Sequence, residues 1–187
     1  MAVVTVTNLI EGPGTIYKGL FGAVEPLDAS VNAAPATSAW TDLGGTKDGS
    51  TLTIEREFHE MEVDQVVDIP ERRVTKRDAS IKTNLAEATL ENLALASNDS
   101  APTTGANFKS YTPTNVDSAT QVTYFAIILD GYAPGGFRRR VIGRRMLNTA
   151  NIELAYKKDD QTVIPVEFHA HYVALATAPY KIVDQTV

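Results

Sequence analysis

TLTIEREFHEMEVDQ, residues 51–65, is the stretch that decides the fold of this 187-residue chain. Thr, Ile, Phe and Val are frequent in it and Gly and Pro are absent, which is typical of one long β-strand. Its large apolar residues change parity along the way, from even to odd positions: Leu52, Ile54 and Phe58, then Met61 and Val63. A β-bulge near His59 would explain the change, as would a strand that passes from one packing environment to another.

Most of the remaining chain also has the pattern of strands. Residues 72–83 form a second long strand that is unusually polar. Residues 121–131 are apolar at both parities, so this strand is predicted to be buried on both faces. A hairpin is predicted about residues 157–161, between strands at residues 152–156 and 164–172.

One helix and three segments without apolar periodicity complete the pattern. The helix covers residues 84–97, with Asn84 as its N-cap and Glu87 in a capping box. The segments without periodicity are an N-terminal arm and two extended loops, at residues 1–22, 28–39 and 101–119. The prediction is therefore a mainly β fold in a single domain over residues 1–187.

The composition excludes several classes of function. The formal net charge is −6 at pH 7, which disfavours tight nucleic-acid binding because neutralising phosphates needs a basic face. The chain has no Cys, so disulfides, thiolate metal sites and a Cys nucleophile are excluded. No run approaches the ~20 apolar residues of a membrane span, and the first residues lack the features of a signal peptide. A protein that folds in a cytoplasm is expected.

The tripeptide Glu-Phe-His occurs twice, at residues 57–59 and 167–169, each time after a Lys-Asp turn. Two equivalent hairpin strands would explain the repeat, and chance similarity is the alternative. In the second copy His169 and His171 have the polar parity, where a His-x-His pair with His59 as a third ligand would suit a metal. A solvated or interface strand face is the favoured interpretation, so we predict no metal and no cofactor.

Acidic residues dominate residues 55–71, where Arg56 alone opposes them. Five of the acids alternate along the strand on its two faces: Glu60, Glu62 and Asp64 on one, Glu55 and Glu57 on the other. Like charges side by side repel unless they are solvated or paired. Acids at every second position therefore indicate the lining of a surface, and an acid/base couple of a hydrolase is a less favoured alternative.

Residues 138–145 are strongly basic. They hold five arginines: Arg138, Arg139, Arg140, Arg144 and Arg145. Arginine is favoured in protein interfaces as well as on nucleic-acid-binding surfaces. A basic strand and an acidic strand on one protomer suit a head-to-tail ring of identical copies, which we favour over a nucleic-acid patch.

Several short motifs follow one another in a familiar order. They are Trp40, Leu43, Gly44 and Thr46 before the turn at Gly49, the step Asp64-Gln65, the helix motif Thr89-Leu90-Glu91-Asn92-Leu93, and the closing strand IPVEFHA at residues 164–170. In this order the motifs resemble the major tail tube proteins of long-tailed, siphovirus-type bacteriophages. The resemblance covers about residues 40–98 and 120–175.

The resemblance implies both an architecture and an assembly. The expected fold is a two-sheet β-sandwich or barrel of the tail tube type, with one flanking α-helix and long loops. Six copies would close a ring and the rings would stack into a tube, assembled in the host bacterial cytoplasm and found in the virion tail. The implied partners are other copies of the chain, a tape measure protein inside the tube, and the tail terminator and distal tail proteins. DNA would pass transiently and non-specifically, and neither an enzymatic activity nor a membrane is implied.

The resemblance also implies roles for the acidic residues 55–64 and the basic residues 138–145. A basic bore would hold DNA, whereas an acidic bore repels phosphate. Glu60, Glu62 and Asp64 are therefore expected to face the lumen, with Glu55 and Glu57 as the alternative face, and the five arginines to face a neighbouring subunit. The alternative function is a soluble β-sandwich binding module that holds a ligand or metal on the His/Glu strand.

Overall fold

The computed structural model describes residues 4–114, 117, 119 and 122–186. It is mainly β. The strands are β1 (Thr15–Leu20), β2 (Thr41–Asp42), β3 (Thr46–Met61), β4 (Glu71–Leu85), β5 (Thr103–Thr104), β6 (Lys109–Ser110), β7 (Phe125–Tyr132), β8 (Arg138–Asn148), β9 (Ile164–Ala170) and β10 (Tyr180–Asp184). The helix α1 covers Leu90–Ala96, and short 3-10 turns lie at Val6–Asn8, Asp28–Ser30 and Pro134–Gly136.

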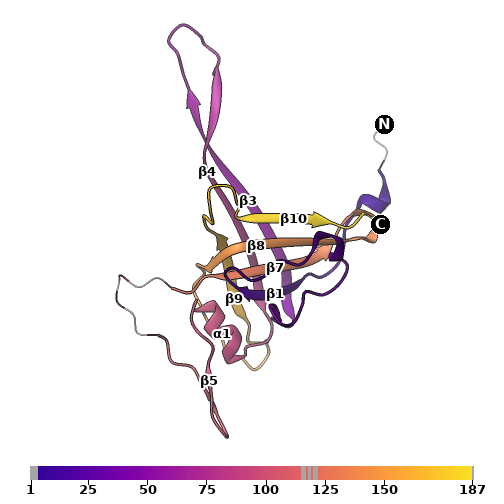
Figure 1. Cartoon of the computed structure of the whole chain (residues 1–187), viewed down its shortest axis with the longest axis vertical. Coiled ribbons are helices and arrows are strands. Elements are labelled where there is room, and N and C mark those ends of the chain that lie inside the picture. The colour runs from indigo at the N-terminus through magenta and orange to yellow at the C-terminus, as the bar shows by residue number, and fades with distance from the viewer. Residues whose placement is uncertain (1–3, 115–116, 118, 120–121, 187) are drawn as a thin grey trace.

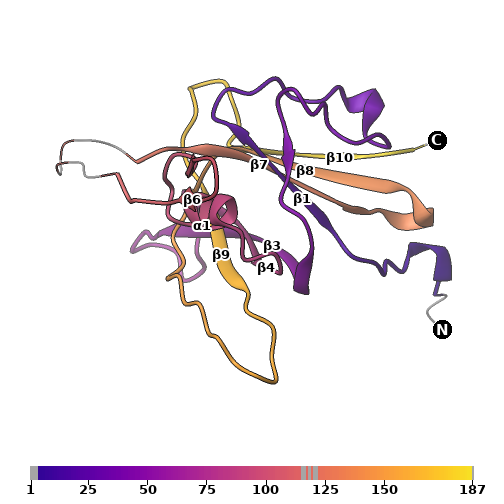
Figure 2. The same cartoon turned by 90° about the horizontal axis from the view of Figure 1, so that it is seen from below.

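Among these residues, eight strands form one antiparallel sheet in the order β2-β1-β7-β8-β9-β4-β3, and β10 also pairs with β8. β10 pairs with residues 139–143 of β8 and β9 with residues 146–148, so the sheet divides along this strand. β1, β7, β8 and β10 form one layer, and β9, β4 and β3 cross it in a second layer (Figures 1 and 2). Strands that change layers are how crossed β-sandwiches make their corners. The predicted mainly β fold of the tail tube type, with one helix, is confirmed, with its two layers formed by one continuous sheet.

The main core fills the space between the two layers and α1. Its buried residues are Ile16, Leu43, Ile81, Leu85, Leu95, Ala96, Phe125, Ile127, Val141, Met146, Ile164, Val166 and Phe168. A second cluster of Trp40, Ala126, Ile128 and Ile142 lies on the other face of β7 and β8. Successive residues of β7 thus enter opposite clusters, which confirms that this strand is buried on both faces.

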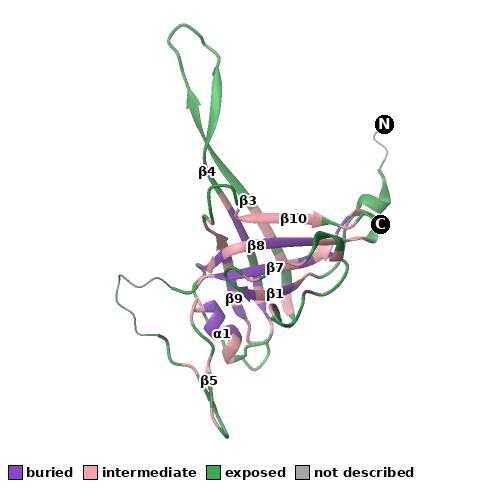
Figure 3. Ribbon diagram, viewed as in Figure 1, coloured by how far each residue is buried: buried purple, intermediate pink, exposed green. Residues whose placement is uncertain are grey.

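The β3–β4 hairpin extends well beyond the sandwich. Every residue from 54 to 77 is exposed, and Figure 3 shows this part of the hairpin standing clear of the buried core. The pairing register shifts between Glu57 and Phe58, so a bulge lies near His59 as predicted, but not in the strand whose parity change it was meant to explain. Its extra residue is Thr75 on β4, whose hydroxyl donates to the carbonyl oxygen of Glu57 at 3.2 Å. The bulge therefore lies in the partner strand and leaves the parity of β3 itself unchanged.

The helix begins later than predicted. Thr89 is its N-cap, and the Thr89 hydroxyl accepts a hydrogen bond from the backbone N–H of Asn92 at 3.2 Å. The predicted cap at Asn84 is wrong because Asn84 is held in β4, where it pairs with Lys47 of β3 and Pro165 of β9. The Glu87 carboxylate instead accepts a hydrogen bond from the backbone N–H of Gly45 at 3.1 Å.

The predicted strand at residues 152–156 is also wrong, because this segment is irregular. The end of β8 and the residues after it take this edge of β9 only from Glu167 onward. The backbone N–H of Glu167 donates to the Asn148 side chain at 2.7 Å, and the carbonyl oxygen of Glu167 accepts from the Thr149 N–H at 3.0 Å. Ile152 and Leu154 pack against the main core without joining the sheet.

The arm and loops differ in part from their predicted extents. Residues 15–20 of the expected arm 1–22 are strand β1, whose Ile16 is buried, and residues 1–3 lie outside the described part of the chain. The loop at residues 28–39 contains one 3-10 turn, and Val31 in it is buried. The loop at residues 101–119 contains the small β5–β6 ladder, and its positions 115, 116 and 118 are not described.

The repeated Glu-Phe-His tripeptides lie on the two strands that flank β4, but they are not equivalent. Phe168 of β9 and Leu52 of β3 both pair with Ile81, at the centre of the sandwich. Phe58 pairs instead with Val74, far out on the hairpin. Phe168 is consequently fully buried and Phe58 is 54% exposed.

Candidate assembly surfaces

The arginine strand β8 makes its closest contacts within the protomer. Arg140 is the most buried of the five arginines, at 2% exposure. Its guanidinium forms two hydrogen bonds to the Asp130 carboxylate, at 2.7 and 2.6 Å, and reaches the carbonyl oxygens of Ser30 and Ala33. Arg140 therefore joins β7, β8 and the 28–39 loop in one protomer, and it is not available to a neighbouring subunit.

The other four arginines are partly exposed. Arg139 binds the Asp184 carboxylate through two hydrogen bonds of 2.6 Å, which lower the pKa of that carboxyl. Arg144 contacts Glu25 at 2.5 Å, and the remaining two stack on aromatic rings. Arg138 lies 4.9 Å from the centroid of the Tyr132 ring and Arg145 lies 4.0 Å from that of Tyr124.

The register of β3 and β4 separates the five acidic candidates by face. Leu52 and Ile81 are paired and belong to the core side, so the odd positions of β3 point away from the core. Glu55 and Glu57 lie on this outward face, where they pair with Asp78 and Lys76. The outward face of β3, β4 and β9 also carries Ser80, Lys82, Glu167 and His169.

Glu60 lies on the opposite face of the hairpin, where it forms a 2.8 Å ion pair with Arg72. Glu62 and Asp64 follow the end of β3, in the segment that joins the two strands at the tip. The acids thus occupy three settings, and only Glu55 and Glu57 continue the outward polar face of the sandwich.

The core-side face of the hairpin continues beyond the core. Ile54, Phe58 and Val74 are on this face and are 41–54% exposed. Arg56 and Arg77 lie directly opposite each other between them. Like charges in directly opposed positions are destabilising, so this surface is suited to a partner that supplies carboxylates and apolar side chains.

The sheet has one long free edge. β3 is the last strand in the pairing order, and among the described residues its 16 residues pair with β4 alone. β10 likewise pairs with β8 alone in the described part of the chain. Unpaired edge strands present a row of backbone donors and acceptors to other chains.

The histidines form local contacts. His169 lies 3.1 Å from the Asp78 carboxylate and 3.5 Å from that of Glu167. His171 Nδ1 lies 2.9 Å from the carbonyl oxygen of His169, and His59 is exposed on the hairpin. Within the described residues, no group of three or more His, Asp or Glu side chains is arranged to hold a metal ion.

Comparison with known proteins gives this geometry its context. A family model described as "Phage tail tube protein" matches residues 1–185, which is nearly the whole chain. No curated protein matches the chain. The matched family consists of structural components of the phage tail, assembled from repeated subunits. The chain belongs to the phage tail tube protein family, and it is a virion tail component.

None of the helices in the described residues has the length and apolar character needed to cross a membrane.

Proposed function

We propose that six copies of this chain close a ring, and that the rings stack into the tube through which phage DNA is delivered. The observation that carries the proposal is the exposed hairpin at residues 54–77, bordered by the free edge of β3, in a chain of this family. A long free edge beside exposed apolar side chains is an aggregation hazard in a lone protomer. Pairing around a closed ring removes that edge.

The proposed assembly involves other tail components. The tape measure protein occupies the tube during assembly, and the tail terminator and distal tail proteins bind its two ends. Assembly takes place in the host bacterial cytoplasm, and the chain acts as a single tail tube domain without catalysis. The N-terminal arm and the loop at residues 101–119 contact neighbouring rings.

The lumen is lined, in this proposal, by the outward face of β3, β4 and β9. This face is polar where its opposite side covers the core, and Glu55 and Glu57 continue it onto the exposed hairpin, which supports them as the lumen-facing acids. Glu60, Glu62 and Asp64, which the sequence favoured, are assigned to the opposite face and the tip of the hairpin. Arg138, Arg139, Arg144 and Arg145 are proposed to contact the neighbouring subunit, since each is partly exposed.

Electron microscopy of the purified chain tests the proposal. Negatively stained samples are expected to contain rings of six subunits and tubes of stacked rings, whose abundance rises with protein concentration. Sedimentation of the same samples would show a mass increase in steps of the ring. A protein that remains monomeric at every concentration, and also in the presence of the tape measure protein, would contradict the proposal.

Reversing the charge of the lumen should slow DNA release. Phage that carry Glu55→Lys and Glu57→Lys are expected to assemble tails of normal length but to eject DNA more slowly, because lysines in the bore bind phosphate. Added salt should restore part of the rate through screening.

The matched control for the charge reversal is Glu153→Lys with Asp159→Lys, which makes the same charge change in an exposed loop. Ejection would be followed by the fluorescence of a DNA-binding dye. Equal rates of DNA ejection for the two double variants would show that Glu55 and Glu57 do not face the lumen.

A further inference from the structure

Three arginines of β8 each bind a carboxylate inside the protomer with the same two nitrogens, Nε and Nη2. The pairs are Arg139–Asp184, Arg140–Asp130 and Arg144–Glu25. Arg145 differs from them, because its Nε is buried and no described residue accepts a hydrogen bond from it. A buried donor on a charged group is unfavourable without an acceptor. The same edge of Arg145 is therefore suited to a carboxylate from outside the protomer.

The guanidinium of Arg145 is held in position by its surroundings. Its central carbon lies 4.0 Å from the centroid of the Tyr124 ring and 5.6 Å from that of the Phe21 ring. Its Nη1 donates to the carbonyl oxygen of Tyr172 at 2.8 Å. Phe21 and Tyr172 are exposed, so these four residues, which we call the Arg145 site, lie at the surface. A planar cation fixed between two rings is ready to bind a carboxylate with two parallel hydrogen bonds.

A β-bulge in β8 explains how the site is formed. The pairing of β7 with β8 skips one residue of β8, so Arg144 and Arg145 both lie opposite Ala126. A bulge of this kind re-aims side chains that a regular strand sends to opposite faces. Both arginines consequently reach the same two segments, residues 21–25 and 172–178. Arg144 binds Glu25 of its own protomer, which leaves Arg145 for a partner.

The N-terminal arm carries the matching groups. Glu11 is exposed, and its carboxylate has no ion pair or hydrogen bond within the part of the chain that the structure describes. Leu9 and Ile10 precede it and are exposed as well. The arm thus presents one carboxylate beside two apolar side chains, whereas the Arg145 site presents one cation between aromatic rings. The two surfaces are complementary in charge and in apolar character.

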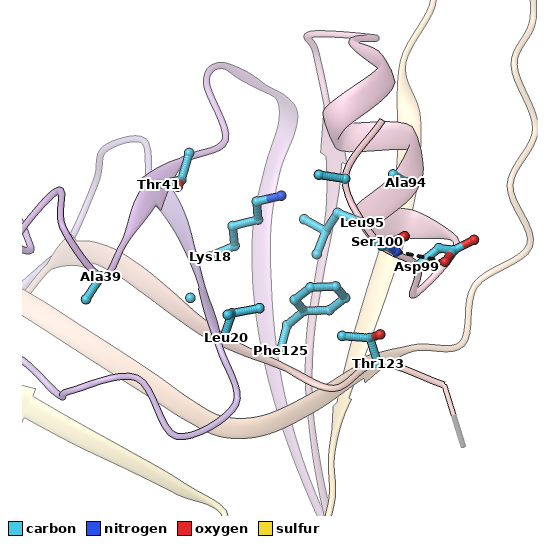
Figure 4. A pocket seen from close by; sticks show the side chains of 12 residues that line it. Lys18, Leu20, Ala39, Thr41, Ala94, Leu95, Asp99, Ser100, Thr123 and Phe125 are labelled. Atoms are coloured by element: carbon cyan, nitrogen blue, oxygen red, sulfur yellow. Dashed lines mark hydrogen bonds between the residues drawn. The ribbon is translucent and has the colours of Figure 1, made fainter. Parts of the chain in front are cut away.

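In one protomer the arm and the Arg145 site lie at opposite ends of β1. Leu20, the last residue of β1, pairs with Phe125, the first residue of β7, and Figure 4 shows these two side chains together near α1. The site is at this end. The arm precedes the other end, where its turn Val6–Asn8 lies beside Pro134–Gly136 after β7. β1 is about 20 Å long, whereas the chain between Glu11 and β1 spans at most about 14 Å. The arm therefore does not fill its own site.

We propose that Arg145 binds the Glu11 carboxylate of the neighbouring protomer in the same ring through Nε and Nη2. Leu9 and Ile10 of that arm cover Phe21. A contact between opposite ends of identical subunits runs head to tail, which is the kind of contact that closes a ring. This inference rests on the proposed function, because it assigns one contact within the ring. The part of the arm before Leu9 keeps its reach to a neighbouring ring.

Disulfide trapping tests the contact, since the natural chain contains no Cys. A chain with both Ile10→Cys and Tyr172→Cys is assembled and oxidised, and the covalent products are separated in denaturant. We expect a ladder of linked subunits that ends at six. It should form roughly ten-fold or more faster than with Ile10→Cys and Tyr156→Cys, because docking raises the local thiol concentration. Tyr156 is 83% exposed and Tyr172 67%, so the control thiol is at least as free to collide at random.

Substitutions at the two charges test the ion pair. Glu11→Gln should raise the protein concentration at which half of the chains form rings by roughly ten-fold or more. The fold should not change, because Glu11 is exposed in the protomer, and Glu153→Gln in another exposed segment is the matched control. Arg145→Lys keeps a cation but loses the paired nitrogens, so it should weaken rings as well. Adding Glu11→Gln to Arg145→Lys should then have little further effect.

Different results overturn different statements. Equal cross-linking through Tyr172→Cys and Tyr156→Cys, or fully additive effects of the two charge substitutions, would overturn the contact while leaving the tube function in place. A ladder that continues beyond six would show a contact between rings and would also overturn it. So would faster cross-linking of Tyr172→Cys to Val67→Cys than to Ile10→Cys, because the hairpin tip would then be the occupant. Absence of rings from the natural chain would instead count against the proposed function itself.

Discussion

Replacing Arg140 with Met is expected to lower the free energy of unfolding of the protomer by about 3–5 kcal/mol. The Arg140–Asp130 pair is almost completely buried and is joined by two short hydrogen bonds. Removing one partner leaves the other charge buried without compensation, which costs far more than the loss of an ion pair in water. The carbonyl oxygens of Ser30 and Ala33 would lose their donor as well.

The neighbouring residue provides a matched control. Arg139 makes an equally short two-bond pair with Asp184, but both side chains are more than a third exposed. Arg139→Met should therefore cost less than about 1 kcal/mol. Urea denaturation followed by the fluorescence of Trp40, the one tryptophan of the chain, would measure both variants. Equal losses would show that burial does not govern these two pairs.

The second large effect is expected at Phe168. Its side chain is fully buried in the main core, so Phe168→Ala should destabilise the protomer by about 3–5 kcal/mol. Lost apolar burial and an unfilled cavity both contribute to this value. The same denaturation measurement applies, with no change expected in the unfolding mechanism.

Phe58 is the control, because it occupies the same place in the other Glu-Phe-His tripeptide. Phe58→Ala removes an exposed side chain and should change the stability of the protomer by no more than about 0.5 kcal/mol. If the hairpin makes contacts between subunits, the same substitution should weaken assembly instead. A large loss of protomer stability at Phe58 would mean that the hairpin folds back onto the core in solution.

Sequence reasoning succeeded where one local pattern dominates. The continuous apolar run in β7 indicates a strand covered on both faces, as the structure has it. The parity change in β3 points to a bulge in that strand, but the extra residue is in its partner β4. Sequence reasoning failed where long-range pairing overrides a local signal. Asn84 followed by Glu87 has the form of a helix start, but β3 and β9 hold Asn84 in a central strand.

The candidate surfaces were predicted less completely than the fold. A cluster of arginines indicates a surface role, yet Arg140 meets Asp130 and the 28–39 loop inside the protomer. Its loop partners lie more than a hundred positions away in the chain. Likewise, strand parity separates Glu55 from Glu60, but the sequence does not reveal which face covers the core. Only the pairing of Leu52 with Ile81 assigns the two faces.

The position of the hairpin outside the core also affects how this protein can evolve. Residues 54–77 are all exposed in the protomer and none belongs to its core, so most substitutions there should change folding little and act mainly on assembly. Buried core residues such as Phe168 tolerate few substitutions, because most of them would destabilise the protomer. Two related phages could therefore share one stable scaffold while diverging at the hairpin and at any surface of a neighbouring subunit that it contacts. In a mixed infection, subunits of both kinds would fold equally well, but mismatched pairs would be excluded from a common tail.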